Sequence, residues 1–158
     1  MDGIVLLKED HKAVKRLFRE FEKTHKTATN TDKRKLVDQI LHELTTHAFI
    51  EETIFYPAAR AEVPDTDDHV LESVEEHHVV AWLCSELKTL DPAEETFDAK
   101  VTVLIENVEH HAEEEENEWF PQVRKALSRK RLTELGEQME AARPQAPSDP
   151  LALMSARS

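Results

Sequence analysis

The sequence predicts an all-α protein, an antiparallel up-down-up-down four-helix bundle with a short C-terminal fifth helix. Three observations lead to this fold class. Only 2 of the 158 residues are glycine and 34% are charged, and leucine, glutamate, lysine and alanine are plentiful, which favours helices. Apolar residues recur at alternating spacings of three and four along four segments. Short links between these segments favour antiparallel neighbours.

The first two predicted helices form one hairpin. The first runs from about Val5 to His25. The second follows Asn30 and Thr31, which can cap it. Pro57 and then Pro64 bend or end this second helix, because proline lacks a backbone N–H and clashes with the preceding turn.

The next two helices form a second hairpin. The third helix follows Pro64-Asp65-Thr66, and the fourth follows Asp91-Pro92 and reaches about Leu127. Asp91 can cap a short first turn. A fifth helix from Ser128 to Ala142 has leucines and a methionine on one face, so we expect it to brace the bundle.

These helices make one domain, residues 1–142, which the length of the chain also predicts. Residues 143–158 contain three prolines and small polar residues, and we expect a flexible or loosely docked tail.

The composition excludes several classes of protein. No apolar run is long enough to span a membrane, and no basic-then-apolar signal opens the chain. The single cysteine fits a reducing compartment, so we expect a cytoplasmic location. A net charge of -13 argues against nucleic acid or an anionic membrane as a partner.

One eleven-residue phrase occurs twice, as His47–Pro57 and His111–Pro121. In each copy a glutamate follows the histidine by four residues, and two aromatic residues precede the final proline. These glutamates are Glu51 and Glu115. Residues i and i+4 of a helix lie on one face, so each phrase presents an imidazole beside a carboxylate.

The repeat extends to the helix before each phrase. Asp10–Val14 aligns with Glu76–Val80, which matches His11 with His77. His11 precedes His47 by 36 residues, and His77 precedes His111 by 34. Two similar hairpins thus supply matching sets, and we expect each His-Glu pair to be completed by the histidine of its own preceding helix.

Six polar residues therefore face the predicted core: His11, His47, Glu51, His77, His111 and Glu115. Burying them without partners would cost several kcal/mol each. A hydrogen-bonded polar core is one solution, and metal is the other. The set exceeds one tetrahedral zinc. It suits two iron ions with terminal histidines, bridging or capping glutamates, and an oxo or hydroxo bridge.

On these six residues the chain resembles the hemerythrin-like (HHE cation-binding) domain family, from Val5 to about Met139. The surrounding stretches Glu76–Val80 and His110–Glu116 are also typical of bacterial members. The resemblance implies a non-haem di-iron centre in a four-helix bundle. It also implies roles in dioxygen binding, in oxygen or redox sensing, or in handling iron, peroxide or nitric oxide.

The chain departs from oxygen-carrying hemerythrins at two places. Ser73 stands where they have a further histidine, and the last motif ends at Glu115 rather than at a more distant aspartate. We therefore expect an open position on iron. The function we expect is binding of dioxygen or a related small oxidant, with catalase-like peroxide decomposition as the candidate activity. The alternative is a non-catalytic oxygen, redox or nitric oxide sensor, or an iron-handling module.

Adjacent residues leave two ligand choices open. His77 is preferred over His78 because it aligns with His11. His111 is preferred over His110 because only His111 reproduces the distance to the proline. A ferritin-like di-iron oxidase is the alternative fold, but it needs Glu-x-x-His on two helices, and only Glu75–His78 fits.

Two further side chains have two interpretations each. Tyr56, nine residues after His47, would lie on the opposite face of an ideal helix. Because it precedes Pro57, a distorted backbone could bring the phenol to iron as an additional ligand; otherwise Tyr56 is a core aromatic. Cys84 is a small buried hydrophobe or a redox-sensing thiol.

Overall fold

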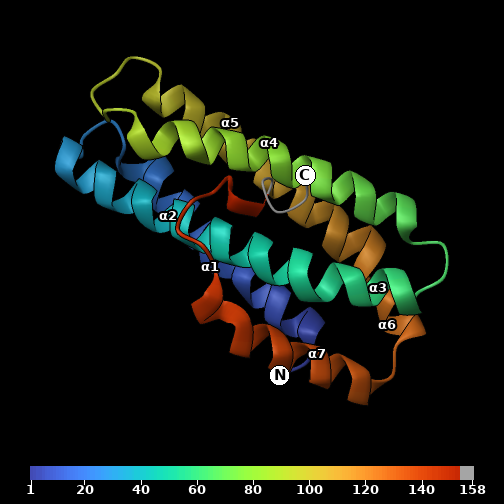
Figure 1. Ribbon diagram of the computed structural model, residues 1–158. Helices are drawn as coiled ribbons and strands as arrows, with labels where there is room; N and C mark the ends of the chain where they lie inside the picture. The colour runs from blue at the N-terminus through green and yellow to red at the C-terminus, as the bar shows by residue number, and fades with distance from the viewer. Residues whose placement is uncertain (154–158) are drawn as a thin grey trace.

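The computed structural model describes residues 1–153 and confirms the predicted all-α bundle (Figure 1). Four helical rods pack antiparallel, and a fifth helix crosses one end. The first and third rods are α1 (Gly3–Thr24) and α4 (Asp67–Thr89). The second rod is made of α2 (Asn30–Ile50), the π turn η1 (Glu51–Phe55) and α3 (Tyr56–Glu62). The fourth is made of α5 (Phe97–Glu114), the π turn η2 (Glu115–Trp119) and α6 (Phe120–Ala126).

The helix starts differ in two places from the sequence prediction. Thr29, rather than Asn30 or Thr31, caps α2, because its side chain accepts a hydrogen bond from the Asp32 N–H at 3.1 Å. The predicted first turn after Pro92 is not part of α5, which begins only at Phe97. Asp91 instead accepts from the N–H of Ala93 at 2.9 Å and closes a separate turn.

Pro57 does not end the second rod. The N–H of Tyr56 binds the carbonyl of Glu51, five residues back, so the chain makes one π turn and continues to Glu62. The wider turn accommodates the proline without breaking the rod. The N–H of Phe120 binds Glu115 in the same way before Pro121. Each π turn adds a residue to the helix and rotates the side chains that follow it.

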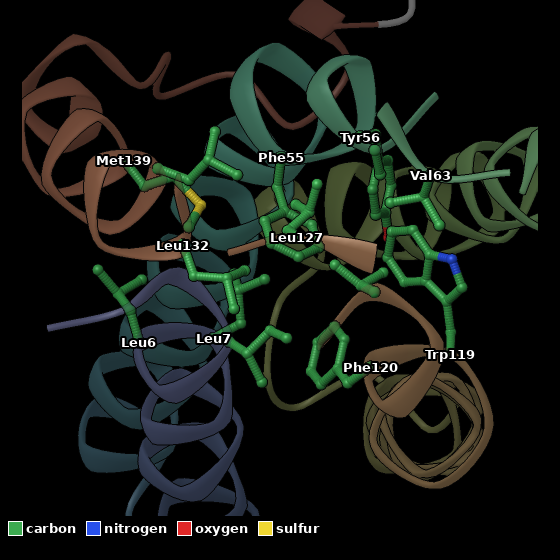
Figure 2. Packing of buried hydrophobic residues seen from close by; sticks show 14 of the residues in the cluster. Leu6, Leu7, Phe55, Tyr56, Val63, Trp119, Phe120, Leu127, Leu132 and Met139 are labelled. Carbon is green, nitrogen blue, oxygen red and sulfur yellow. The ribbon is translucent and has the colours of Figure 1, made fainter. Parts of the chain in front are cut away.

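The apolar core consists of two clusters, one at each end of the bundle. The first gathers the π turns, the start of α1 and α7 (Arg129–Ala142), and Figure 2 shows its aromatic part around Phe55, Trp119 and Phe120. The second, around Phe18, Phe21 and Phe97, fills the opposite end. A polar layer lies between them.

The fifth helix, α7, packs closely against the first residues of the chain. A Cβ on Gly136 would lie 2.0 Å from the carbonyl oxygen of Met1, so only glycine allows this approach. Ser128 caps α7 by accepting from the Arg131 N–H at 3.1 Å.

After α7 the chain turns back across the bundle. A short 3-10 turn, η3 (Arg143–Gln145), is followed by a segment in which Pro150 is buried, and Lys88 donates to the Ser148 carbonyl at 2.9 Å. Figure 1 shows this red segment lying over α2 and α4. Residues 154–158 of the predicted tail lie outside the described residues, and the flexibility of 143–158 stays a prediction. No described helix has the length and apolar character to cross a membrane.

Candidate metal centre

The six predicted site residues all lie in the polar layer between the two apolar clusters. Their side-chain donor atoms form two groups of three, and within each group these atoms lie within 4.8 Å of one another. One group is His11, His47 and Glu115; the other is His77, His111 and Glu51. The four histidines pair by hairpin, as the sequence analysis predicts. Each glutamate, however, is grouped with the histidines of the other hairpin.

The two carboxylates connect the groups. Glu51 Oε1 lies 3.1 Å from His47 Nε2 and 3.3 Å from His77 Nε2. Glu115 Oε1 lies 3.3 Å from His11 Nε2, and its Oε2 lies 3.5 Å from His111 Nε2. Each glutamate thus contacts one histidine from each hairpin, which is the arrangement required of a carboxylate that bridges two cations.

Every histidine of the centre has an acidic partner on its outer nitrogen. The Nδ1 atoms lie 2.8 Å from Glu116 for His11, 2.8 Å from Asp10 for His47, 2.8 Å from Glu52 for His77 and 3.4 Å from Glu76 for His111. Such partners fix the ring orientation and the tautomer of metal-binding imidazoles. Here they leave all four Nε2 atoms facing the centre.

The sequence also carries a signal for these outer acids, because each of them adjoins a site residue in the chain. Asp10 and Glu76 precede the matched histidines, and Glu52 and Glu116 follow the matched glutamates. The repeat therefore encodes the outer acids as well as the inner set.

The burial of the centre tests whether a cation fits. Glu51 and Glu115 are fully buried, and both oxygens of Glu51, Oε1 of Glu115 and Nε2 of His47 have no hydrogen bond. Buried carboxylate oxygens that accept no hydrogen bond are costly. Acceptor-only oxygens beside imidazole nitrogens are the donor set that a transition-metal ion satisfies. The residues therefore fit a pair of cations.

The same crowding changes the protonation of the centre when no cation is present. Burial by itself lowers the pKa of His47, but the charges of Glu51 and Asp10 outweigh it and raise that pKa to about 10. Burial opposes ionisation of Glu115, but His111 and His11 hold its pKa well below the usual range. In the absence of a cation, the raised pKa of His47 thus favours its protonated form, whose charge offsets the carboxylates.

Tyr56 reaches the centre. Its hydroxyl donates to Glu115 Oε2 at 2.7 Å and lies 3.3 Å from the Nε2 atoms of both His77 and His111. The π turn explains the position, because an ideal helix would put Tyr56 on the far side from His47. Phe120, the matching residue of the other copy, stacks on His11 with ring centroids 6.1 Å apart. The phenol is therefore close enough to be a ligand, and its role as one stays a prediction.

The neighbouring histidines lie outside the centre. His110 is 69% exposed in its side chain and pairs with Glu114 at 3.0 Å. His78 pairs with Glu75 at 3.0 Å on the outer side of α4. The structure thus brings together the residues preferred from the repeat, and it leaves the Glu75–His78 pair of the ferritin-like alternative apart.

A cavity of about 60 Å³ adjoins the four histidines. Its walls are mostly apolar and include Val14, Val80, Val108 and the buried thiol of Cys84. Burial raises the pKa of this thiol to about 12, so Cys84 is a neutral wall residue. Since a cavity of about 150 Å³ binds benzene, this much smaller cavity suits molecules of only a few heavy atoms.

Comparison with known proteins agrees with this geometry. The family model described as the hemerythrin HHE cation-binding domain matches residues 2–123. The chain belongs to this family. An "uncharacterized protein Rv2633c" of Mycobacterium tuberculosis is 33% identical over 157 residues, covering 96% of this chain and 91% of the relative. The crystal structure of its Mycobacterium kansasii homologue, titled as an HHE cation-binding domain-containing protein, has a TM-score of 0.76 and 27% identity, covering 100% of this chain and 93% of that one.

A second kind of relative is much longer. A "DNA nickase" from Nostoc sp. is 27% identical over 141 residues, which cover 87% of this chain and only 38% of the nickase. The shared part is thus a minor portion of that protein.

Proposed function

We propose that this HHE domain holds two iron ions with an oxo or hydroxo bridge, and that the centre binds dioxygen or a related small oxidant and decomposes peroxide. Two three-residue groups joined by two fully buried carboxylates carry this proposal. The terminal ligands would be His11, His47, His77 and His111, and Glu51 and Glu115 would bridge.

The donor set favours iron over zinc. Structural zinc sites take four ligands in a tetrahedron, usually with cysteine, and the one cysteine here is not among the six donors. Four imidazoles and two bridging carboxylates match the requirements of two iron ions, which accept nitrogen and oxygen donors and more than four ligands each. Iron held by these residues would supply the redox chemistry.

The residues around the centre perform three tasks in this proposal. The outer acids hold the imidazoles in place, so the site needs little rearrangement when a ligand arrives. The apolar cavity walls exclude bulk water and admit only small molecules. Tyr56 offers a proton donor 2.7 Å from Glu115 Oε2, next to the second group. Decomposition of two molecules of hydrogen peroxide then gives one dioxygen and two waters, without an external reductant.

Metal analysis combined with optical spectroscopy tests the metal. We expect about two irons per chain, as for other two-metal sites, with absorption in the near ultraviolet from the bridge. A colourless protein that contains zinc would contradict the proposal. An oxygen electrode tests the reaction, and sustained oxygen release from hydrogen peroxide is expected.

A non-catalytic sensor or iron-handling module is the second candidate. The small, mostly apolar cavity favours it, because slow exchange with solvent suits a centre that reports on an oxidant rather than consuming it. Bleaching of the absorption by peroxide without sustained oxygen release would identify this class. The net charge of -13 disfavours the contact with DNA that a nickase requires.

A further inference from the structure

The cavity beside the centre has walls from the bundle and a roof from another part of the chain. The walls come from α1, α2, α4 and α5, whereas Pro150 and Leu153 come from the segment that follows α7. We name residues 146–153 the roof segment. Pro150 is buried and Leu153 is half-buried, so their side chains lie between the cavity and solvent.

The roof segment is held by two polar contacts, one just before it and one within it. Just before it, Arg143 donates to Asp10 Oδ1 at 2.7 Å, and the other oxygen of Asp10 lies 2.8 Å from His47 Nδ1. Within it, Lys88 of α4 donates to the Ser148 carbonyl at 2.9 Å. The segment is therefore tied to α1 through Arg143 and to α4 through Lys88.

The cavity under the roof is small. Its volume of about 60 Å³ is less than half of the roughly 150 Å³ of a cavity that binds benzene, so it suits dioxygen, nitric oxide or hydrogen peroxide better than a hydroperoxide with a branched carbon substituent. Apart from the site residues, the lining is apolar except for Asp10, Glu43, Thr45 and Glu52, so a larger polar molecule would gain few compensating contacts.

We propose that the roof segment makes the centre selective by size, with Pro150 and Leu153 as specificity-determining residues that admit hydrogen peroxide and exclude organic hydroperoxides. This inference rests on the proposed function for the identity of the reactants, but the closure of the cavity can be tested without it. The selectivity comes from the tail and not from the bundle.

The first test uses the iron-loaded, reduced protein and stopped-flow oxidation by hydrogen peroxide or tert-butyl hydroperoxide. In both reactions the O–O bond breaks and two ferrous ions supply two electrons. With two protons, hydrogen peroxide gives two waters, and tert-butyl hydroperoxide gives one water and tert-butanol. The wild-type protein is expected to react faster with hydrogen peroxide. The double variant Pro150→Ala/Leu153→Ala should narrow this preference by on the order of tenfold, the low end of what one methylene in a pocket controls.

Leu151→Ala is the matched control, because Leu151 lies in the same segment and does not line the cavity. It should keep the wild-type preference. Equal acceleration of both oxidants in the double variant, or a wild-type protein without preference, would overturn size selection by the roof.

The second test needs no iron. Cys84 is the only cysteine of the chain, is 1% exposed and lines the cavity, so its modification reports entry into the cavity. Methyl methanethiosulfonate is a small probe and dithiobis(nitrobenzoate) is a bulky one. The double variant should increase the rate at which Cys84 is labelled by the bulky probe more than the rate with the small probe. Leu151→Ala should leave both labelling rates unchanged.

The two tests separate two failures. If the protein does not bind iron, the proposed function fails, and the labelling of Cys84 still decides whether the roof closes the cavity. If iron binds but the double variant labels as slowly with the bulky probe as the wild type does, the roof inference fails alone.

Discussion

His11, from the first hairpin, stacks on the phenyl ring of Phe120, whereas His77 and His111, from the second, both lie beside the hydroxyl of Tyr56. The two pairs are otherwise built alike, since their ring centroids are 5.0 and 4.9 Å apart and every ring has an outer acid. One pair thus has an apolar neighbour and the other has a proton donor.

A second difference lies one turn before the histidines of α1 and α4. Leu7 precedes His11, and Ser73 precedes His77. The short Ser73 side chain is buried beside Tyr56, where a larger residue would compete with the phenol for space. The duplicated hairpin therefore supplies two similar metal positions, and single substitutions make the second one the reactive position in our proposal.

The largest expected effect comes from Glu51→Ala or Glu115→Ala. Each carboxylate contacts histidines of both hairpins, so either variant should lose both metal ions rather than one. The free energy of unfolding of the loaded protein should fall by about 4 kcal/mol, the linkage expected for a ligand present at a thousand times its Kd. Metal analysis and thermal unfolding measure the two quantities.

His78→Ala is the control for that experiment, because His78 lies outside the centre. This variant should keep both the metal content and the stability of the wild-type protein. Loss of one ion per chain in either glutamate variant would show that the two groups bind independently.

A smaller effect is expected from Tyr56→Phe, which makes the two pairs alike. Removing the donor next to Glu115 should lower peroxide turnover by about a hundredfold, the low end for a positioned acid, while metal content is kept. Adding Phe120→Tyr to this variant moves the hydroxyl to the first pair. Recovery of turnover in the double variant would mean that the two positions are equivalent.

The outer acids should differ in importance. Asp10→Asn is expected to weaken metal binding by about tenfold, because Asp10 lies 2.8 Å from its histidine. Glu76→Gln should have less effect, since its contact with His111 is 3.4 Å long and more exposed. Competition with a chromophoric chelator measures both affinities. Asp10→Asn alters both the ion pair of Asp10 with Arg143 and its contact with His47. Arg143→Ala removes the ion pair alone, so comparison of the two variants isolates the contribution of the His47 contact.

The smallest effect concerns the metal-free protein. The pKa of His47 is raised from 6.5 to about 10 in the folded state, so the stabilisation it gives is complete below pH 6.5 and is lost as the pH rises towards 10. The melting temperature should therefore fall across this range. Asp10→Asn should flatten the slope by removing one of the two charges, and a melting temperature that rises with pH would contradict this assignment.

The sequence predicted the fold and the six inner residues because both follow from periodicity. The apolar stripes define the helices, and the repeated register selects His77 over His78 and His111 over His110. The grouping of Glu51 and Glu115 each with the histidines of the other hairpin could not be predicted. Spacing along a helix shows which residues share a face but not which side chains of other helices they contact. The position of Tyr56 could not be predicted either, because the π turn before it rotates its side chain towards the centre, whereas an ideal α-helix would place it on the opposite face.

The position of the roof segment could not be predicted from the sequence for a different reason. Its prolines and small polar residues are typical of flexible tails, and its position depends on two isolated contacts, from Arg143 and Lys88, that no periodic pattern announces. The same holds for Gly136, whose role is visible only once α7 is seen to touch the carbonyl of Met1.

The separation of the apolar core into two clusters has a consequence for cooperativity. Hydrophobic contacts join the helices within each end of the bundle, but the layer between the ends is polar. Two bridged cations would couple these ends into one unfolding unit. Without them, hydrogen exchange should resolve two subglobal openings, and the end that contains α7 should be distinguishable from the end around Phe97.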